Sequence, residues 1–144
     1  MKHKKILITG GAGFLGSHLV QYLLQKGEDE IVIFDKLENH EPENYGKNVV
    51  YFKGNILSKE DVVRLFKECG PFSTIYHLAS AMPNKAVADD ILWKTNVLGT
   101  TNIVSEAVRN KANSFIFTSR NVTYGIPQTL PVTEETILTP LEMY

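Results

Sequence analysis

The sequence predicts an α/β fold built on a doubly wound parallel β-sheet, and two features of the sequence together with one general rule carry this prediction. Short apolar runs typical of buried strands alternate along the chain with longer segments of helical periodicity. The segment Ile6–Gly16 joins the first such strand to the first helix through a cluster of glycines. Strands that alternate with helices form parallel sheets, whose ligands bind beyond the carboxyl ends of the strands. The residues at those ends are therefore the candidates for function.

Length and composition favour a single globular domain. The chain has 144 residues, of which 43% are hydrophobic and 22% are charged, which is ordinary for a globular protein. The formal net charge is −1, so the sequence has no excess of positive charge that would bind nucleic acid, and we expect no nucleic-acid partner. No apolar stretch approaches membrane-spanning length, and the apolar run behind the basic start is too short for a signal peptide.

Cysteine and histidine usage gives no sign of a disulfide or a metal site. Cys69 is the only cysteine, so we interpret it as a packing residue and predict a reducing, cytoplasmic location. The four histidines are scattered without the spacing of metal ligands, and no bound metal is expected.

Each expected element follows from a local signal. Gly27 ends the first helix as a left-handed cap, Ser58 opens the second helix in a capping box with Asp61, and Gly70-Pro71 ends it. Pro42 and Gly46 make 36–48 a surface loop. The expected strands are Lys4–Thr9, Ile31–Asp35, Val49–Phe52, Thr74–Leu78 and Phe115–Ser119, and the outer helices are Phe14–Lys26 and Ala86–Asn110. The expected core positions of the later helices are Val62, Val63 and Phe66, then Leu92, Val97, Leu98, Val104, Ala107 and Val108.

The glycine cluster predicts an anion-binding turn. Backbone N–H groups at a helix start are unpaired, and the helix dipole adds partial positive charge, so a pyrophosphate fits there. Gly10 permits the tight turn, Gly13 lets a phosphate approach, and Gly16 lets the helix pack close to the strand. A glycine-rich turn without a ligand is the alternative.

Asp35 indicates which dinucleotide the turn would hold. It ends the second apolar run, roughly 20 residues past the glycines, where a carboxylate can accept both ribose hydroxyls. Because an acid there repels a 2′-phosphate, NAD is favoured over NADP, a preference that the adjacent Lys36 weakens a little. A solvated turn acid is the alternative for Asp35.

Taken together, these motifs resemble the N-terminal part of the extended short-chain dehydrogenase/reductase family, the NAD-dependent sugar epimerases and dehydratases. The matching segments occur in the family's order and are Thr9–Gly16, Asp35, Gly54-Asn55-Ile56, His77-Leu78-Ala79-Ser80, Asn96–Thr100, Ser119–Gly125 and Pro140–Tyr144. The resemblance implies a Rossmann-type domain in which NAD would be bound by Gly10, Gly13, Phe14, Leu15, Gly16, Asp35, Lys36, Asn55, Ile56, Leu78, Ala79, Ser80 and Asn96. It also implies a nucleotide-sugar substrate, transient hydride transfer and a homodimer formed through two helices per subunit.

Two positions depart from the family pattern. Asn55 replaces the usual Asp; its oxygen can still accept from the adenine amino group, so we expect weaker NAD binding, with a plain turn Asn as the alternative. Arg120 stands where the family has the second hydroxyl residue of its Ser-Ser pair, and a guanidinium can accept neither a proton nor a hydrogen bond. Ser119 is adjacent but points to the opposite face of the strand, so it is a poor substitute. Arg120 either binds a negative group on an unusual substrate or marks a site that has lost its chemistry.

Tyr144, the last residue, matches the family's general acid/base, but the Lys that should follow four residues later is not present. A free tyrosine titrates near pH ~10 and is a poor base at neutral pH without that Lys. We therefore expect a truncated enzyme, inactive alone, whose 144 residues form an incomplete NAD-binding domain and leave Phe115–Ser119 without its outer neighbour. The alternatives are a non-catalytic NAD-binding module and a related dehydrogenase acting on a steroid or other non-sugar alcohol.

Overall fold

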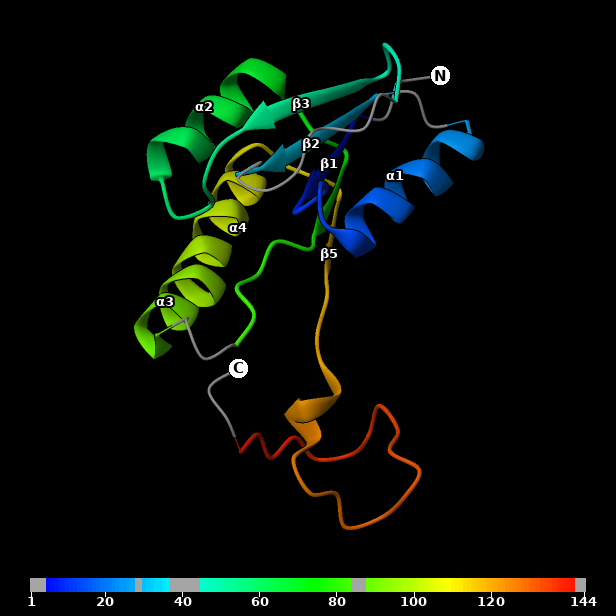
Figure 1. Cartoon of the computed structure of the whole chain (residues 1–144), viewed down its shortest axis with the longest axis vertical. Coiled ribbons are helices and arrows are strands. Elements are labelled where there is room, and N and C mark those ends of the chain that lie inside the picture. The colour runs from blue at the N-terminus through cyan, green and yellow to red at the C-terminus, as the bar shows by residue number, and fades with distance from the viewer. Residues whose placement is uncertain (1–4, 28–29, 37–44, 84–87, 142–144) are drawn as a thin grey trace.

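The fold of the chain, seen in a computed structural model, is a five-stranded parallel sheet between helices (Figure 1). The structure describes residues 5–27, 30–36, 45–83 and 88–141. The strands are β1 (Ile6–Thr9), β2 (Ile31–Asp35), β3 (Val49–Lys53), β4 (Thr74–His77) and β5 (Ser114–Phe117). Their order in the sheet is β3-β2-β1-β4-β5, and every neighbouring pair is parallel. The predicted Rossmann-type α/β fold is confirmed, with β5 at one edge of the described sheet.

The two faces of the sheet carry different helices. Helix α1 (Phe14–Gln25) covers one face, where Val20 and Leu23 pack against Ile6 and Ile8 of β1. On the other face lie α2 (Lys59–Cys69) and a long helix made of α3 (Asp89–Trp93), the π-helical segment η1 (Lys94–Gly99) and α4 (Thr100–Arg109). Leu7 of β1 packs with this second layer. Successive strand residues thus point to opposite faces, and both faces of the sheet's centre are buried.

Most local signals placed the helix ends correctly. Gly27 follows α1 with a φ of +82°, and the Ser58 hydroxyl accepts a hydrogen bond from the Asp61 N–H at 3.1 Å. The predicted burial of Val63 is wrong, because α2 buries Val62, Leu65 and Phe66, and Val63 lies about 100° around the helix from Val62.

The buried face of the long helix also differs from the prediction. Leu92 and Ala107 are buried as expected, but Val97, Leu98, Val104 and Val108 are exposed. The face against the sheet consists of Leu92, Thr95, Gly99, Ile103, Glu106 and Ala107. A Cβ on Gly99 would lie 2.6 Å from Cδ1 of Ile56, so the helix meets the loop after β3 through a small residue at close range. Expected helix residues 86–87 and most of the expected loop 36–48 lie outside the described residues.

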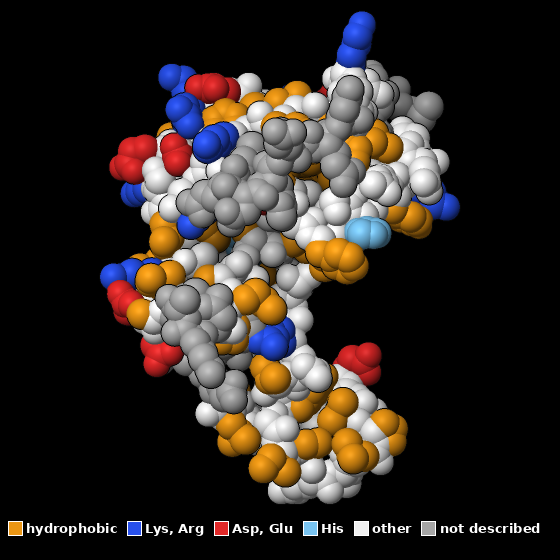
Figure 2. Space-filling model, in the orientation of Figure 1, with side chains coloured by type: hydrophobic (Ala, Val, Ile, Leu, Met, Phe, Trp, Pro, Cys, Tyr) orange, Lys and Arg blue, Asp and Glu red, His pale blue; other side chains and the backbone are white. Residues whose placement is uncertain are grey.

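Beyond β5 the chain continues as an extended arm, residues 118–141, which contains the short 3-10 helix η2 (Asn121–Tyr124). Figure 1 shows the arm, orange to red, reaching away from the sheet. Figure 2 shows hydrophobic side chains gathered on it, and Ile126 and Ile137 are 81% and 80% exposed. Within the described parts of the chain, no helix is both long and apolar enough to span a membrane.

Candidate cofactor-binding site

A cavity of about 550 Å³ lies at the carboxyl ends of the central strands. The predicted cofactor residues that line it are Gly10, Gly13, Asp35, Lys36, Asn55, Ile56, Leu78, Ala79 and Ser80. They follow the ends of β1, β2, β3 and β4, so the parallel sheet brings together segments that lie far apart in the sequence. The cavity occupies the place where open α/β sheets bind their ligands.

The glycine turn forms one wall of this cavity at very close range to the loop after β4. Gly10 has a φ of +69°, and a Cβ on it would lie 2.7 Å from the backbone N of Ala79. A Cβ on Gly16 would lie 2.4 Å from the carbonyl oxygen of Gly10, so α1 can start here only without a side chain at that position. At both positions an added side chain would clash with nearby backbone, and at Gly10 the positive φ also favours glycine.

The start of α1 is open to an anion. Gly13 is the N-cap residue, and no described side chain caps the first N–H groups of the helix. Phe14 and Leu15, the first two residues of α1, are 84% and 57% exposed. The uncapped N–H groups and the helix dipole together supply partial positive charge next to the cavity.

Asp35 lies at the end of β2 against the same turn. Its Oδ2 accepts a hydrogen bond from the N–H of Ala12 at 3.1 Å, and its backbone oxygen accepts from the N–H of Gly54 at 2.9 Å. The carboxylate is thereby fixed between the glycine turn and the loop after β3, on the cavity wall.

The loop after β3 is shaped by two asparagines. Oδ1 of Asn55 accepts from the N–H of Leu57 at 3.0 Å, which is the bond of an Asx turn. Nδ2 of Asn102 in α4 donates to the carbonyl of Ile56 at 2.9 Å and ties the loop to the long helix. Asn55 thus has a structural task of its own, and a second lone pair on Oδ1 is left over for any other donor.

Asn96 was also predicted to bind the cofactor, but its side chain does not line the cavity and instead supports a residue that does. It lies in η1, its Oδ1 accepts from the N–H of Ala81 at 2.8 Å, and its Nδ2 donates to the carbonyl of Ala81 at 3.1 Å. Ala81 lines the cavity, so Asn96 holds the wall in place. A π-helical segment at such a position is typical of functional sites.

Of the three predicted catalytic residues, the structure describes Ser119 and Arg120, and neither of them lines this cavity. Ser119 and Arg120 are exposed and follow β5 on the way into the arm. The carbonyl of Arg120 accepts from the Thr123 hydroxyl at 2.7 Å, which sets the start of η2. Tyr144 lies outside the described residues.

The predicted set lacked six residues that line the cavity: Phe34, Gly54, Ala81, Met82, Ile91 and Thr95. Ile91 and Thr95 are four residues apart and therefore share one face of the helix that follows the small-residue loop. That spacing was the available signal, although Thr95 carries no chemistry that would single it out.

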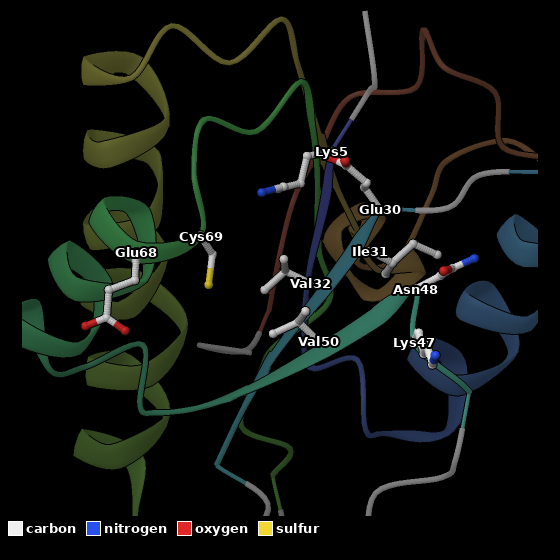
Figure 3. A pocket seen from close by; sticks show the side chains of 9 residues that line it. All are labelled: Lys5, Glu30, Ile31, Val32, Lys47, Asn48, Val50, Glu68 and Cys69. Carbon is white, nitrogen blue, oxygen red and sulfur yellow. The ribbon is translucent and has the colours of Figure 1, made fainter.

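A second cavity, of about 610 Å³, lies at the opposite ends of the strands (Figure 3). Lys5, Val32 and Val50 line it, with Glu68 and Cys69 from the end of α2. Burial raises the pKa of the Cys69 thiol, and the nearby Lys5 partly offsets this rise. A raised pKa makes the thiol a poorer nucleophile, in agreement with a packing role.

Comparison with known proteins finds relatives that match nearly the whole chain. The UDP-glucose 4-epimerase of Haemophilus influenzae is 32% identical in an alignment that covers 90% of this chain and 40% of that protein. The enzyme of Erwinia amylovora is 34% identical over 140 residues, covering 91% of this chain and 41% of that protein. The chain thus spans well under half of the length of these relatives.

Solved structures agree with the sequence relatives. The Bordetella bronchiseptica enzyme WbmG, in complex with NAD and UDP, superposes with a TM-score of 0.86 at 27% identity, over 96% of this chain and 45% of that one. The UDP-glucose 4-epimerase of Thermus thermophilus, in complex with NAD, gives 0.83 at 31% identity, over 94% of this chain and 44% of that one. The sequence profile of the NAD dependent epimerase/dehydratase family matches residues 6–144. The chain belongs to the NAD dependent epimerase/dehydratase family.

Proposed function

We propose that this chain is the NAD-binding part of an epimerase or dehydratase that acts on a nucleotide sugar. The observation that carries the proposal is the cavity that joins the glycine turn, Asp35 and the loops after β3 and β4. Relatives described as UDP-glucose 4-epimerases support a uridine-diphosphate sugar as the substrate. Residues 1–144 would then form one NAD-binding domain.

The residues around the cavity fit NAD. The uncapped N–H groups of Phe14 and Leu15 would hold the pyrophosphate, since no described side chain competes for them. Asp35 would accept the ribose hydroxyls, and the loop of Asn55 and Ile56 would flank the adenine. Small residues such as Ala79 leave room for the other ribose.

NAD, when bound, would take a hydride from the sugar and return it. Within this chain, we propose that Tyr144 exchanges the proton of the sugar hydroxyl and that Ser119 and Arg120 contact the reacting group. Arg120 brings a fixed positive charge to a place where the family has a hydroxyl, so it would orient an anionic or strongly polar substrate group without accepting a proton.

The long helix supports a homodimer as a further part of the proposal. Trp93, Val97, Val104 and Val108 follow helical spacing and remain exposed, Val108 to 73%. An apolar stripe of this kind is typical of a helix that packs against a partner, and a second copy of the same helix is the proposed partner.

Calorimetric titration with NAD, combined with NMR detection of UDP-glucose epimerisation, tests the enzyme hypothesis. We expect the 144-residue chain to bind NAD and to show no turnover, and a form of the protein with a complete substrate region to show both. Failure of the chain to bind NAD would refute the proposal.

A non-catalytic NAD-binding module is the second candidate, and Arg120 at the usual hydroxyl position is the observation that favours it. It predicts that NAD binds in every form of the protein while no nucleotide sugar is converted. Turnover by any form would remove it.

A further inference from the structure

A chain of hydrogen bonds links β1, β4 and α4, and its members Thr9 and His77 directly precede the lining residues Gly10 and Leu78 of the candidate cavity. Nδ1 of His77, at the end of β4, lies 2.7 Å from Oγ1 of Thr9, at the end of β1. Nε2 of His77 lies 2.9 Å from Oγ1 of Thr100, at the start of α4. Thr9 and His77 are 0% and 1% exposed, so the bond between them is buried, whereas Thr100 is partly buried.

The partners of the two threonines determine where every proton lies. The hydroxyl of Thr100 donates to the carbonyl of Asn96 at 2.7 Å, so its oxygen can only accept from His77, and Nε2 must carry the hydrogen. Nδ1 is then the acceptor, and the hydroxyl of Thr9 donates to it. The oxygen of Thr9 in turn accepts from the N–H of Ala79 at 3.2 Å. The ring is thus fixed as the neutral Nε2–H tautomer.

This chain of bonds ends on the loop that faces the glycine turn. Ala79 and Ala81 line the cavity, and Ala81 forms two hydrogen bonds with the side-chain amide of Asn96. The backbone carbonyl of Asn96 also accepts the hydrogen bond from the hydroxyl of Thr100. Gly10, directly after Thr9, approaches Ala79 so closely that a Cβ would lie 2.7 Å from its nitrogen. A shift of the ring would therefore be transmitted to both walls of the cavity.

The surroundings of the ring keep it in this state. The rings of Phe115 and Phe117 in β5 lie 5.8 and 6.0 Å from that of His77, centroid to centroid. Burial lowers the pKa of His77 to about 4, so the ring stays neutral at neutral pH. A second proton, on Nδ1, would force the hydroxyl of Thr9 to give up its acceptor inside the core.

We propose that Thr9, His77 and Thr100 are positioning residues that set the distance between the glycine turn and the Ala79–Ala81 wall, and through it the affinity for NAD. This inference rests on the proposed function, because it assigns the three residues a role in the same cavity. None of them needs to touch the cofactor.

A pair of adjacent threonines provides the test. Thr100→Val removes the acceptor of the Nε2–H group at nearly constant volume, whereas Thr101→Val removes an exposed hydroxyl that donates to the carbonyl of Val97 at 2.8 Å and contacts no part of the His77 network. We expect Thr100→Val to raise the Kd for NAD about tenfold and to speed hydrogen exchange of the Ala79 amide by a similar factor. Thr101→Val should leave both at wild-type values.

Two further measurements keep the proposal open to refutation if Thr100→Val does not fold. The ¹⁵N shifts of His77 in the unaltered chain should report the Nε2–H tautomer, and the Nδ1–H tautomer would overturn the assignment. Thr9→Ser, which keeps the hydroxyl, should bind NAD like the wild type, whereas Thr9→Val should not. If the chain binds no NAD at all, the proposed function is refuted, but hydrogen exchange of the Ala79 amide still tests the network. Equal exchange rates in Thr100→Val and Thr101→Val would refute the role of the network.

Discussion

The walls of the candidate cavity and the arm that follows β5 are built in opposite ways. Around the cavity, loops from different strands contact each other directly, as Gly10 does Ala79 and as Asp35 does Ala12. The arm is held mainly by bonds to itself, such as those from the N–H and hydroxyl of Thr139 to the carbonyls of Thr123 and Tyr124, at 3.0 and 2.8 Å. The proposed cofactor residues thus belong to the first region and Ser119 and Arg120 to the second. Binding and catalysis should therefore be separable by mutation.

The largest effect is expected at the closest contact between the cavity walls. Gly10→Ala adds a Cβ that would lie 2.7 Å from the nitrogen of Ala79, at a backbone φ of +69°. We expect it to destabilise the fold by more than about 2 kcal/mol and to abolish measurable NAD binding, because relief of the clash must move the glycine turn. Thermal melts and calorimetric titration measure the two effects.

Gly27→Ala is the matched control for this change. Gly27 has a φ of +82° and nothing within 4 Å of an added Cβ, so the substitution imposes the backbone strain without the clash. It should cost about 1 kcal/mol and leave the affinity for NAD unaltered. Equal losses in the two variants would show that the contact between the walls is unimportant.

The buried ring of His77 predicts a pH dependence of stability. Burial lowers the pKa of His77 from 6.5 to about 4, so between these values the unfolded chain binds more protons than the folded one. Stability therefore rises with pH across this window, and acidification from pH ~7 to ~4 should remove about 3 kcal/mol through this group. Chemical denaturation at a series of pH values measures the slope.

Two histidine variants isolate this contribution from that of the carboxylates. His77→Gln should flatten the slope between pH 4 and 6.5, whatever its effect on absolute stability. His18→Gln should retain it, because His18 lies on α1, outside the buried network, where its Nδ1 is bonded to the carbonyl of Phe14. An unchanged slope in His77→Gln would place the titrating group elsewhere.

The elements and the glycine turn could be predicted because their causes are local. Glycines at Gly10 and Gly27, and a capping serine at Ser58, act on their immediate neighbours in the chain. Strand order and the cavity at the carboxyl ends follow from general rules for parallel sheets.

The buried face of the long helix could not be predicted, because its cause lies in another element. Both faces carry apolar residues, and the more apolar one, with Val97 and Val104, was the natural choice for the core. The helix instead meets the loop after β3 through Gly99, whose missing side chain makes room for Ile56. It also buries Glu106, which forms an ion pair with Arg109 at 3.0 Å. Hydrophobicity alone does not report such a fit.

A smaller effect is expected from Asp35, which is bonded to both the glycine turn and the loop after β3. Asp35→Ala should weaken NAD binding by about tenfold and improve the affinity for NADP relative to NAD, because the repulsion of a 2′-phosphate disappears. Calorimetry with both cofactors measures this. Glu68→Ala, at the second cavity (Figure 3), removes one negative charge far from the site and should change neither affinity. Equal affinities for the two cofactors in the unaltered chain would contradict the assignment of Asp35.

The smallest effect on cofactor binding is expected on the arm. Arg120 is exposed and does not line the cavity, so Arg120→Ser should leave the affinity for NAD unchanged, as should the control Arg109→Ser on α4. The two variants should differ only toward the substrate: in a form of the protein that converts UDP-glucose, Arg120→Ser should raise the KM if the guanidinium binds a negative group. It should instead keep the KM and raise kcat if the arginine merely displaces the hydroxyl that the family uses. A loss of NAD affinity in Arg120→Ser would mean that the arm and the cavity act as one site, which would end the division between them.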